Sequence, residues 1–241
     1  MRPQHSTPKV AEDVAGRIRR LIHSGALGPG DRLPAEREFA AELGIARVSV
    51  RASLRLLADA GYVTVRRGSR GGTFVSTLDD PYAQWLERMR TQAGDLDAIL
   101  DVRVGVEGHS AFLAAHRRSL AELSTMRQTI DDMVRSETRT SFRSADSQFH
   151  AAVASAARSP RLEALVMQAR GEFFVPTDKL IFREQIDASV IGHRAVLVAL
   201  ERRDAEEARE AMAEHIEVTR VHFHRVIRGS PLQQLKDSSD E

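Results

Sequence analysis

Four side chains in the second half of the chain have the types and the spacing of metal ligands. Asp146 and His150 are four residues apart, so a helix would project both from one face. His193 and His215 each lie on an apolar helical stripe, so three helices would offer polar groups from otherwise apolar faces. Burying a carboxylate and three imidazoles is costly unless they are paired or bound to a metal. This donor set suits a divalent transition ion, with room left for water or a ligand.

Three other interpretations of the charged and polar residues in this half of the chain stay open on spacing alone. A histidine on an apolar stripe is more often a hydrogen-bonded core residue, and the chain has 9 histidines, so some coincidences are expected. Arg103 and Glu107 have the spacing of a surface ion pair across one helical turn. A metal-dependent hydrolase would need a general acid or base beside the metal, and Glu107 and Glu172 are the candidates.

Basic residues gather in the first third of the chain. Residues 1–78 carry 13 Lys/Arg and 7 Asp/Glu, a net charge of +6, whereas residues 79–241 carry 22 and 27, a net charge of −5. A basic part joined to an acidic part indicates that the basic part meets a polyanion such as nucleic acid. The acidic charge of the larger part argues against non-specific coating of DNA.

The arginines of this basic part have a spacing that suits the major groove of DNA. Arg47 and Arg51 are four apart at the start of a predicted helix, and Ser49 beside them is placed to contact a phosphate. Arg37 begins the preceding helix, whose N-terminus also favours a phosphate. The planar guanidinium binds guanine or phosphate through two hydrogen bonds at once. For these arginines considered alone, a solvated basic face is the alternative.

The residues around these arginines predict three helices and a β-hairpin. Apolar spacing predicts the helices, over residues 7–25, 35–43 and 48–60. Alternating strand formers on either side of a glycine-rich turn predict the hairpin, with strands at 62–67 and 73–75. Three helices followed by a hairpin is the order of a winged helix-turn-helix.

Beyond Pro81 the pattern is helical throughout. The amphipathic stretches fall at about 81–92, 95–116, 119–138, 141–157, 160–176, 185–202 and 204–228. In the third stretch one predicted face carries Leu120, Leu123, Met126, Ile130, Met133 and Val134. The predicted fold class is therefore mainly α: an N-terminal winged helix-turn-helix of three helices plus a β-hairpin, followed by an all-α bundle of six or seven helices.

Composition and domain organisation narrow the function classes further. We expect a winged helix-turn-helix at 1–76, a linker at 77–81, a helical domain at 82–229 and a frayed polar tail at 230–241. The absence of cysteine excludes disulfides, a thiol nucleophile and Cys-ligated metal centres. The sequence has neither a long apolar run nor an apolar leader, which predicts a cytoplasmic protein without membrane partners.

The motifs within residues 8–76 occur in the order of a known DNA-binding module. LPAER at 33–37, the R-x-x-x-R pair that begins at Arg47, and GGTFV at 71–75 resemble the DNA-binding domain of the GntR family of bacterial transcription regulators. The resemblance implies that Arg37, Arg47 and Arg51 contact DNA. It also implies that the wing tip, which matches Arg67 and Gly68, enters the minor groove. Ala46 departs from the family, where Ser or Thr is common.

Motifs of the helical part resemble a subfamily of the same regulators. D-x-x-F-H at 146–150, H-R-x-V-L-x-A-L at 193–200 and A-x-x-x-M-x-x-H-I at 208–216 are similar to the effector-binding FCD-type domain of the FadR subfamily. The resemblance implies metal ligands at Asp146, His150, His193 and His215. It also implies that Arg103 faces the pocket and binds a carboxylate of the effector. The complete ligand pattern favours a metal-binding member over the metal-free acyl-CoA sensors.

The prediction is a sequence-specific transcription regulator, acting as a repressor. Its helical domain is expected to bind one divalent transition metal per chain and a small carboxylate effector that alters operator affinity. Zinc is the first expectation, with nickel and manganese as alternatives. The expected partners are a pseudo-palindromic double-stranded operator, a small organic acid and a second copy of the chain in a homodimer. The alternative is a metal-dependent hydrolase with an appended DNA-binding module.

Overall fold

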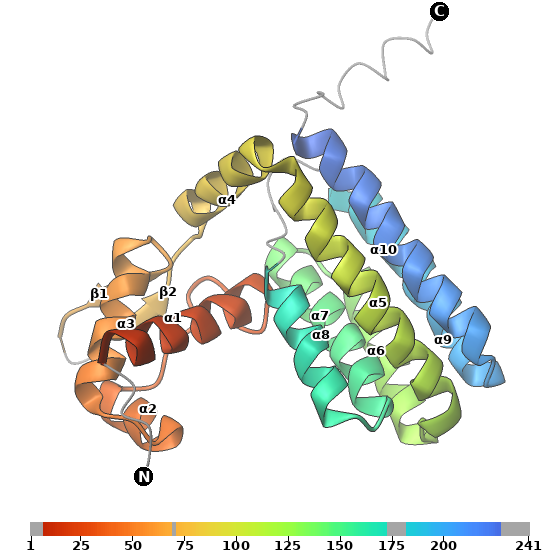
Figure 1. Ribbon diagram of the computed structural model, residues 1–241, viewed down its shortest axis with the longest axis horizontal. Helices are drawn as coiled ribbons and strands as arrows, with labels where there is room; N and C mark the ends of the chain where they lie inside the picture. Colours follow the sequence, from red (N-terminus) through yellow and green to blue (C-terminus); the bar gives the residue numbers. More distant parts are fainter. Residues whose placement is uncertain (1–6, 69–70, 173–181, 228–241) are drawn as a thin grey trace, which may run out of the picture.

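The computed structural model describes residues 7–68, 71–172 and 182–227 (Figure 1). An N-terminal part of helices and a hairpin precedes a part that, within the described residues, contains helices only. The two parts meet at the C-terminal end of the first helix, and a further helix runs between them (Figure 1). This order of elements confirms the predicted mainly helical fold class.

The N-terminal part is a winged helix-turn-helix. Its elements are α1 (Thr7–His23), α2 (Glu36–Leu43), α3 (Arg47–Asp59), β1 (Val63–Arg66) and β2 (Gly72–Val75). The strands pair antiparallel, with Val63 opposite Val75 and Arg66 opposite Gly72. Gly44 ends α2 at a φ of 64°, a left-handed conformation that glycine adopts without steric cost. The core of this part contains Ile18, Ile22, Val50, Leu54 and Leu57.

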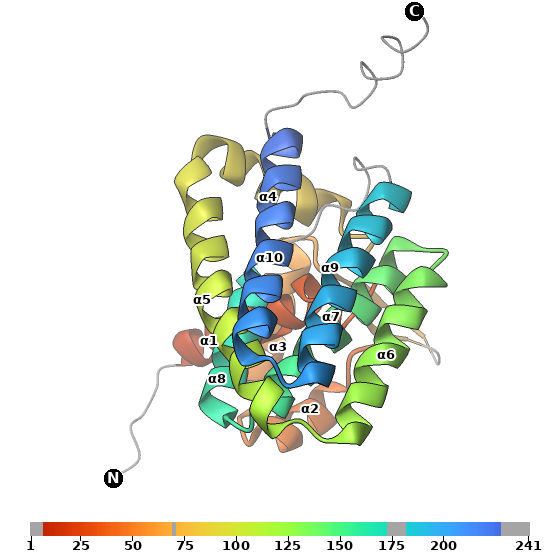
Figure 2. The ribbon, with the colours of Figure 1, turned by 90° about the vertical axis from the view of Figure 1, so that its right-hand side faces the viewer.

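The described residues of the C-terminal part form a bundle of long helices. They are α4 (Asp79–Thr91), α5 (Ala93–Arg117), α6 (Leu120–Val134), α7 (Arg139–Ala156), α8 (Pro160–Glu172), α9 (Phe182–Arg202) and α10 (Ala205–Ile227). Capping boxes start two of them: Ser119 exchanges hydrogen bonds with Glu122 before α6, and Thr138 with Ser141 before α7. α10 packs along α5 and α9, and α6 packs along α7 (Figure 2). Facing apolar stripes of these helices form the core around the predicted metal ligands.

α4 joins the two parts and begins earlier than expected. Its first residue is Asp79, so the last three residues of the expected linker at 77–81 are helical. Asp79 and Asp80 lie in the first turn, where acidic side chains interact favourably with the positive end of the helix dipole. Trp85 of α4 packs edge-to-face on Phe223 of α10, with ring centroids 6.0 Å apart. α4 is therefore anchored to the far helix of the bundle.

The structure corrects two residues of the predicted apolar face of α6. Leu120 and Val134 are 78 % and 42 % exposed, whereas the other four residues of that face are buried. At about 100° per residue, Leu120 points roughly 90° away from the centre of the buried face. Of the helices that the structure describes, none is long and apolar enough to cross a membrane. The expected tail at 230–241 lies outside the described residues.

Candidate metal centre and DNA-binding surface

The four predicted metal ligands come together inside the helical bundle. Asp146 and His150 lie one turn apart on α7, His193 lies on α9 and His215 on α10. One donor atom from each residue lies within 4.8 Å of the donor atoms of the other three. The three histidines are buried, because each belongs to the apolar face that its helix turns to the core.

The distances among the donor atoms fit a shared cation. The Nε2 atom of His193 lies 3.1 Å from Nε2 of His150 and 3.2 Å from Nε2 of His215. It also lies 3.5 Å from Oδ1 of Asp146. With metal–nitrogen bonds of about 2.0–2.1 Å, two ligand atoms are about 3.3–3.4 Å apart in a tetrahedral site and about 2.9 Å apart at right angles. The observed nitrogen separations lie between these two values.

Hydrogen bonding alone does not account for the three facing imidazoles. A neutral Nε2 atom carries either one hydrogen or one lone pair, so His193 cannot satisfy both neighbours well. Phe149 stacks on the His193 ring at 4.1 Å between centroids and fixes its plane. A cation among the lone pairs resolves the conflict, so these residues fit a divalent metal ion.

Glu107 on α5 orients one of the ligands from behind. Its Oε2 atom lies 2.5 Å from Nδ1 of His150. The geometry of this close contact is not that of a hydrogen bond, but a carboxylate beside Nδ1 favours the tautomer with its hydrogen there, which leaves the Nε2 lone pair of His150 for the other donors. Glu107 itself is held by Arg103, whose Nε donates to Oε1 at 2.6 Å. The sequence suggested Glu107 only as an acid or base of an enzyme, and its contact with His150 was not predicted.

Arg170 on α8 holds the candidate ligand Asp146, and this contact was not predicted from the sequence. Its Nη2 atom donates to Oδ2 of Asp146 at 2.7 Å, while Oδ1 of Asp146 faces the histidines. Its Nη1 atom lies 3.6 Å from Oε2 of Glu107. A sequence signal existed, because Arg170 follows the apolar Val166 by four residues and shares its buried face.

Burial and charge set the protonation states that ligation requires. Burial lowers the pKa of His193 to about 3, and it holds the pKa of His150 and His215 well below the usual value. All three imidazoles are therefore neutral at neutral pH. Burial alone would raise the pKa of Asp146, but the Arg170 guanidinium and the neighbouring histidines together hold it below its usual value, so this carboxyl is ionised.

Arg103 and Glu107 are not a surface ion pair, which corrects that interpretation of their spacing. Their side chains are 4 % and 2 % exposed. The face of α5 that carries them turns into the bundle rather than toward solvent. Arg103 lines a cavity together with the ligands Asp146, His150 and His215. The sequence spacing was correct, but it could not reveal on which face of the helix the pair lies.

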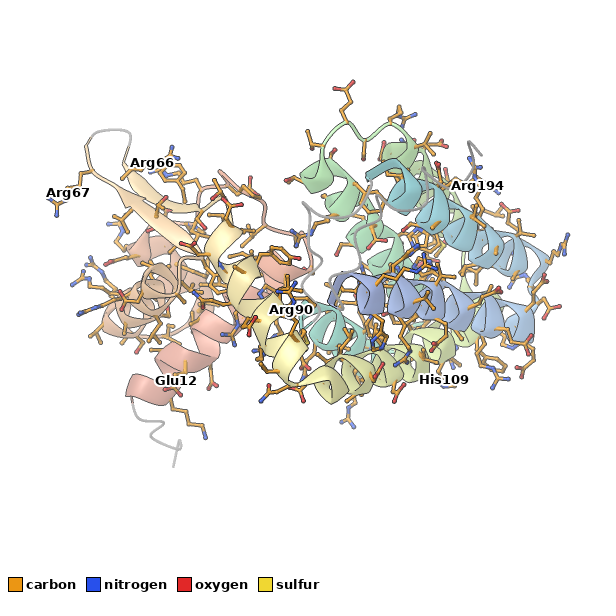
Figure 3. The ribbon with its side chains drawn as sticks, turned by 90° about the horizontal axis from the view of Figure 1, so that it is seen from above. Glu12, Arg66, Arg67, Arg90, His109 and Arg194 are labelled. Carbon is orange, nitrogen blue, oxygen red and sulfur yellow. The ribbon has the colours of Figure 1, made fainter. Side chains whose placement is uncertain are left out.

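The predicted DNA-contact residues lie mainly on the exposed surface of the winged helix. The exposed ones are Arg37, Arg47, Arg51, Arg67 and Gly68. Figure 3 shows Arg67 near the end of the hairpin, pointing away from the body of the protein. Ser49 is only 5 % exposed, so its hydroxyl is not on the surface that carries Arg47 and Arg51. We therefore leave Ser49 out of the contact surface that we propose below.

Three internal contacts hold this surface in shape. Nη2 of Arg51 lies 2.7 Å from Oε2 of Glu36, and Nε donates to the same carboxylate at 3.1 Å. Nη2 of Arg32 donates to the carbonyl oxygen of Gly71 at 2.9 Å and supports the return strand of the wing. The Arg66 guanidinium lies 4.5 Å from the centre of the Phe74 ring.

Known protein families match both parts of the chain. Residues 10–75 match the family described as "Bacterial regulatory proteins, gntR family". Residues 98–218 match the FCD domain, and the predicted metal ligands fall within this match. The two matches correspond to the winged helix and to the bundle.

Several individual proteins are similar over most of their length. The uncharacterized HTH-type transcriptional regulator YcbG of Bacillus subtilis is 32 % identical over 88 % of each chain. The Uxu operon transcriptional regulator of Escherichia coli is 30 % identical, over 90 % of this chain and 88 % of its own.

Two further comparisons agree with these. The putative L-lactate dehydrogenase operon regulatory protein of E. coli is 31 % identical, over 86 % of this chain and 84 % of its own. The solved structure of E. coli McbR/YncC has the same fold, with a TM-score of 0.53 at 17 % identity, over 90 % of this chain and 97 % of its own. The chain therefore belongs to the GntR family of transcription regulators, in the FadR-like subfamily whose C-terminal domain is an FCD domain.

Proposed function

We propose that this regulator is a repressor whose helical domain holds one divalent metal ion and binds a small organic acid that changes its affinity for DNA. The observation that carries the proposal is the convergence of three imidazole nitrogens and one carboxylate oxygen beside a cavity. Arg103 lines the same cavity and offers a guanidinium fork for a carboxylate.

Charge around the centre supports an anionic effector. Among the described side chains, Asp146 and Glu107 are balanced by Arg103 and Arg170, and the three imidazoles are neutral. A divalent ion would leave this buried group with an excess of positive charge. Arg143 on the cavity wall adds a further positive charge, because burial lowers its pKa only to about 10. A carboxylate would offset that charge, and desolvated charges need such a partner.

The charged and polar side chains that line the cavity favour a compact acid. Hydroxy, keto, dicarboxylic and sugar acids carry the oxygen atoms that a metal ion and an arginine recognise. A long acyl-CoA would need an apolar tunnel in place of this charged centre. One relative is named for an L-lactate dehydrogenase operon, and lactate is a hydroxy acid, so the similarity supports this class.

Zinc is the metal ion that we propose, ahead of nickel and manganese. Three imidazoles and one carboxylate match its preference for nitrogen and oxygen donors. When bound, the ion would supply a Lewis-acidic position for an oxygen atom of the effector. Glu107 and Arg170 would keep His150 and Asp146 oriented toward it.

We infer that the winged helix reads a pseudo-palindromic operator as part of a homodimer in the cytoplasm. One small winged helix buries too little surface for operator affinity, and a two-fold dimer contacts two half-sites. The proposed contacts are Arg37, Arg47 and Arg51 in the major groove and the wing tip at Arg67 and Gly68. We keep the division into a DNA-binding domain at 1–76 and an effector and dimerisation domain at 82–229.

The alternative of a metal-dependent hydrolase is not favoured. The family matches are to regulators. Glu107 contacts the far side of His150 and is paired with Arg103, so it is not available as a general base at the metal. Glu172 is exposed at the end of α8.

Three measurements on purified protein test the proposal. Elemental analysis should find about one zinc ion per chain, and His193→Ala should lose it and melt at a lower temperature, whereas His116→Ala on the exposed end of α5 should keep it. A thermal-shift screen of small carboxylic acids should then find a stabilising ligand. DNA from upstream of the protein's own operon should shift in a gel, and the acid should change that shift. A parent protein that stays metal-free after supplementation would reduce the centre to a polar core cluster.

A further inference from the structure

The C-terminal end of α1 is bound by α7 and α8, two of the helices that surround the metal centre. His23, the last residue of α1, is 6 % exposed. Nη2 of Arg143 on α7 donates to the backbone carbonyls of Ile22 at 2.8 Å and of His23 at 2.6 Å. These carbonyls belong to the last turn of α1, where Ile22 also accepts from the backbone N–H of Gly25 at 3.1 Å, and Arg143 adds a charged donor to this helix end.

The His23 ring joins three elements through both of its nitrogens. Nδ1 lies 3.0 Å from the carbonyl oxygen of Gly171 on α8, and Nε2 lies 2.9 Å from the hydroxyl of Tyr62, which precedes β1. A carbonyl can only accept, so Nδ1 donates to it, and the Tyr62 hydroxyl then donates to Nε2. Burial, with nearby Arg19 and Arg143, lowers the pKa of His23 to about 3, so the neutral ring keeps this arrangement at neutral pH.

Each partner of α1 is next to a residue of the metal centre. Gly171 follows Arg170, whose guanidinium holds the ligand Asp146. Arg143 lies three residues before Asp146 on the same helix. His23 and Ser24 line the same cavity as Asp146, His150 and His215. A short chain of contacts therefore runs from Asp146 through Arg170 and Gly171 to His23 and Tyr62, which is the start of the wing.

The contact between the C-terminal end of α1 and the helices α7 and α8 is tightly packed. A Cβ atom built on Gly171 would lie 2.5 Å from Cβ of Arg20, and one on Gly28 would lie 2.7 Å from the methyl group of Thr140. A Cβ atom built on Gly25, which has a φ of 80°, would lie 3.1 Å from the backbone of Arg143. Close-packed interfaces shift as units rather than deform, so a displacement of α7 or α8 must move α1.

We propose that His23 is the positioning residue that couples the metal and effector centre to the winged helix, through its hydrogen bonds to Gly171 and Tyr62. The proposal rests on the metal centre and DNA binding proposed above. Occupation of the centre fixes Asp146 and thereby Arg170, and the backbone of Gly171 then fixes the His23 ring. Tyr62 passes this constraint to the hairpin, so ligation reduces the freedom of the wing relative to the bundle.

The test compares the full-length protein stripped with EDTA and the same protein loaded with Zn²⁺. Hydrogen exchange is measured on peptides from α7, α9 and α10, and separately on the end of α1 and the start of β1. Affinity is measured in both states for a DNA fragment that the parent selects from a random library. The variants are His23→Phe, which keeps a buried ring, and Tyr62→Phe, which removes a single hydroxyl. His116→Phe is the matched control, because His116 is exposed on α5.

In the parent and in the control, Zn²⁺ should slow exchange in both sets of peptides. It should also change DNA affinity by about fivefold or more, the usual lower bound of such couplings. Both variants should keep the zinc-dependent protection of α7, α9 and α10, lose that of α1 and β1, and bring the DNA affinity ratio to within about twofold of unity. Tyr62→Phe keeps the experiment decisive if His23→Phe fails to fold.

Two results overturn the proposal by different routes. If either folded variant keeps the parent's protection of α1 and its zinc-dependent DNA affinity, His23 does not couple the two parts. If Zn²⁺ protects none of α7, α9 and α10 in the parent, the metal centre itself is rejected, and the coupling is rejected with it. The first set of peptides therefore separates failure of the proposed function from failure of the coupling.

Discussion

Replacing Glu107 by glutamine tests whether the centre is held by the carboxylate behind His150. The Glu107 side chain is 2 % exposed and meets His150 Nδ1 at 2.5 Å, Arg103 Nε at 2.6 Å and Arg170 Nη1 at 3.6 Å. Glu107→Gln keeps the shape but removes the charge. Two buried guanidiniums then face a single carboxylate, that of Asp146, and His150 loses the acceptor that fixes its orientation.

The two consequences have different sizes. Removing one partner of a buried ion pair costs about 3–5 kcal/mol of folding stability, because the other charge stays buried and uncompensated. Loss of a carboxylate behind a ligating histidine lowers metal affinity by about 10–100-fold, which is about 1.4–2.8 kcal/mol. The extra positive charge of the variant also opposes the entry of a divalent cation. We therefore expect both a weaker metal site and a less stable fold.

Chelator competition for Zn²⁺ and urea unfolding in EDTA measure these two effects. Glu201→Gln is the control, because Glu201 pairs with Arg127 at 2.6 Å on the surface, with the two side chains 34 % and 54 % exposed. An exposed pair contributes less than about 1 kcal/mol, and this one is remote from the ligands. If Glu107→Gln binds Zn²⁺ within about threefold of the parent and unfolds at the same urea concentration, the orienting role of Glu107 is refuted.

Three further predictions follow from the geometry. Arg51→Ala should weaken operator binding by roughly 1–3 kcal/mol with the fold intact, whereas Arg55→Ala, one turn further along α3, should have little effect; equal affinities in a binding titration would remove Arg51 from the readout. Arg103→Lys keeps a cation beside Glu107 but loses the planar guanidinium fork. DNA binding without acid should therefore survive, while the response to a small carboxylate should disappear. An unchanged response at the same acid concentration would exclude Arg103 as the group that binds the carboxylate. The pKa of His23 is about 3 in the folded protein against 6.5 in the unfolded chain. Between these two values the unfolded chain binds the proton and the folded protein does not. The folding stability present above pH 6.5 is therefore lost as the pH falls toward 3. The loss is about 1.4 kcal/mol per pH unit, and urea unfolding at several pH values should show a shallower slope for His23→Phe than for the parent; equal slopes would contradict the shift.

Periodic features of the sequence predicted the fold and the convergence of the four candidate ligand residues. Asp146 and His150 share a face because they are one helical turn apart, and the apolar neighbours of His193 and His215 fixed which way those side chains turn. The helices of the described residues follow the predicted stretches closely. These features depend on residues close together in the chain, which is where spacing carries information.

Contacts between distant segments could not be predicted in this way. His23 had no evident partner in the sequence, and its partner Gly171 lies 148 positions away. The burial of Arg103 and Glu107 depends on α7, α8 and α10 closing over α5, and an i,i+4 spacing is the same on either face of a helix. Ser49 was predicted as a DNA contact because it lies between Arg47 and Arg51, yet a step of two residues turns a helical side chain by about 200°.

The pair of Arg51 and Glu36 has a consequence for how binding responds to salt. DNA binding releases about 0.9 counterion for each phosphate that a protein cation neutralises, so the salt dependence counts the unpaired cations. Arg51 brings its own carboxylate at 2.7 Å and adds little net charge to the helix that carries it. Removing Arg51 together with Glu36 should therefore lower affinity without flattening the plot of affinity against salt, whereas loss of Arg37 should flatten it by about one unit. The same ion pair therefore raises the share of binding energy that depends on base sequence, and with it the preference for the operator over bulk DNA as ionic strength rises.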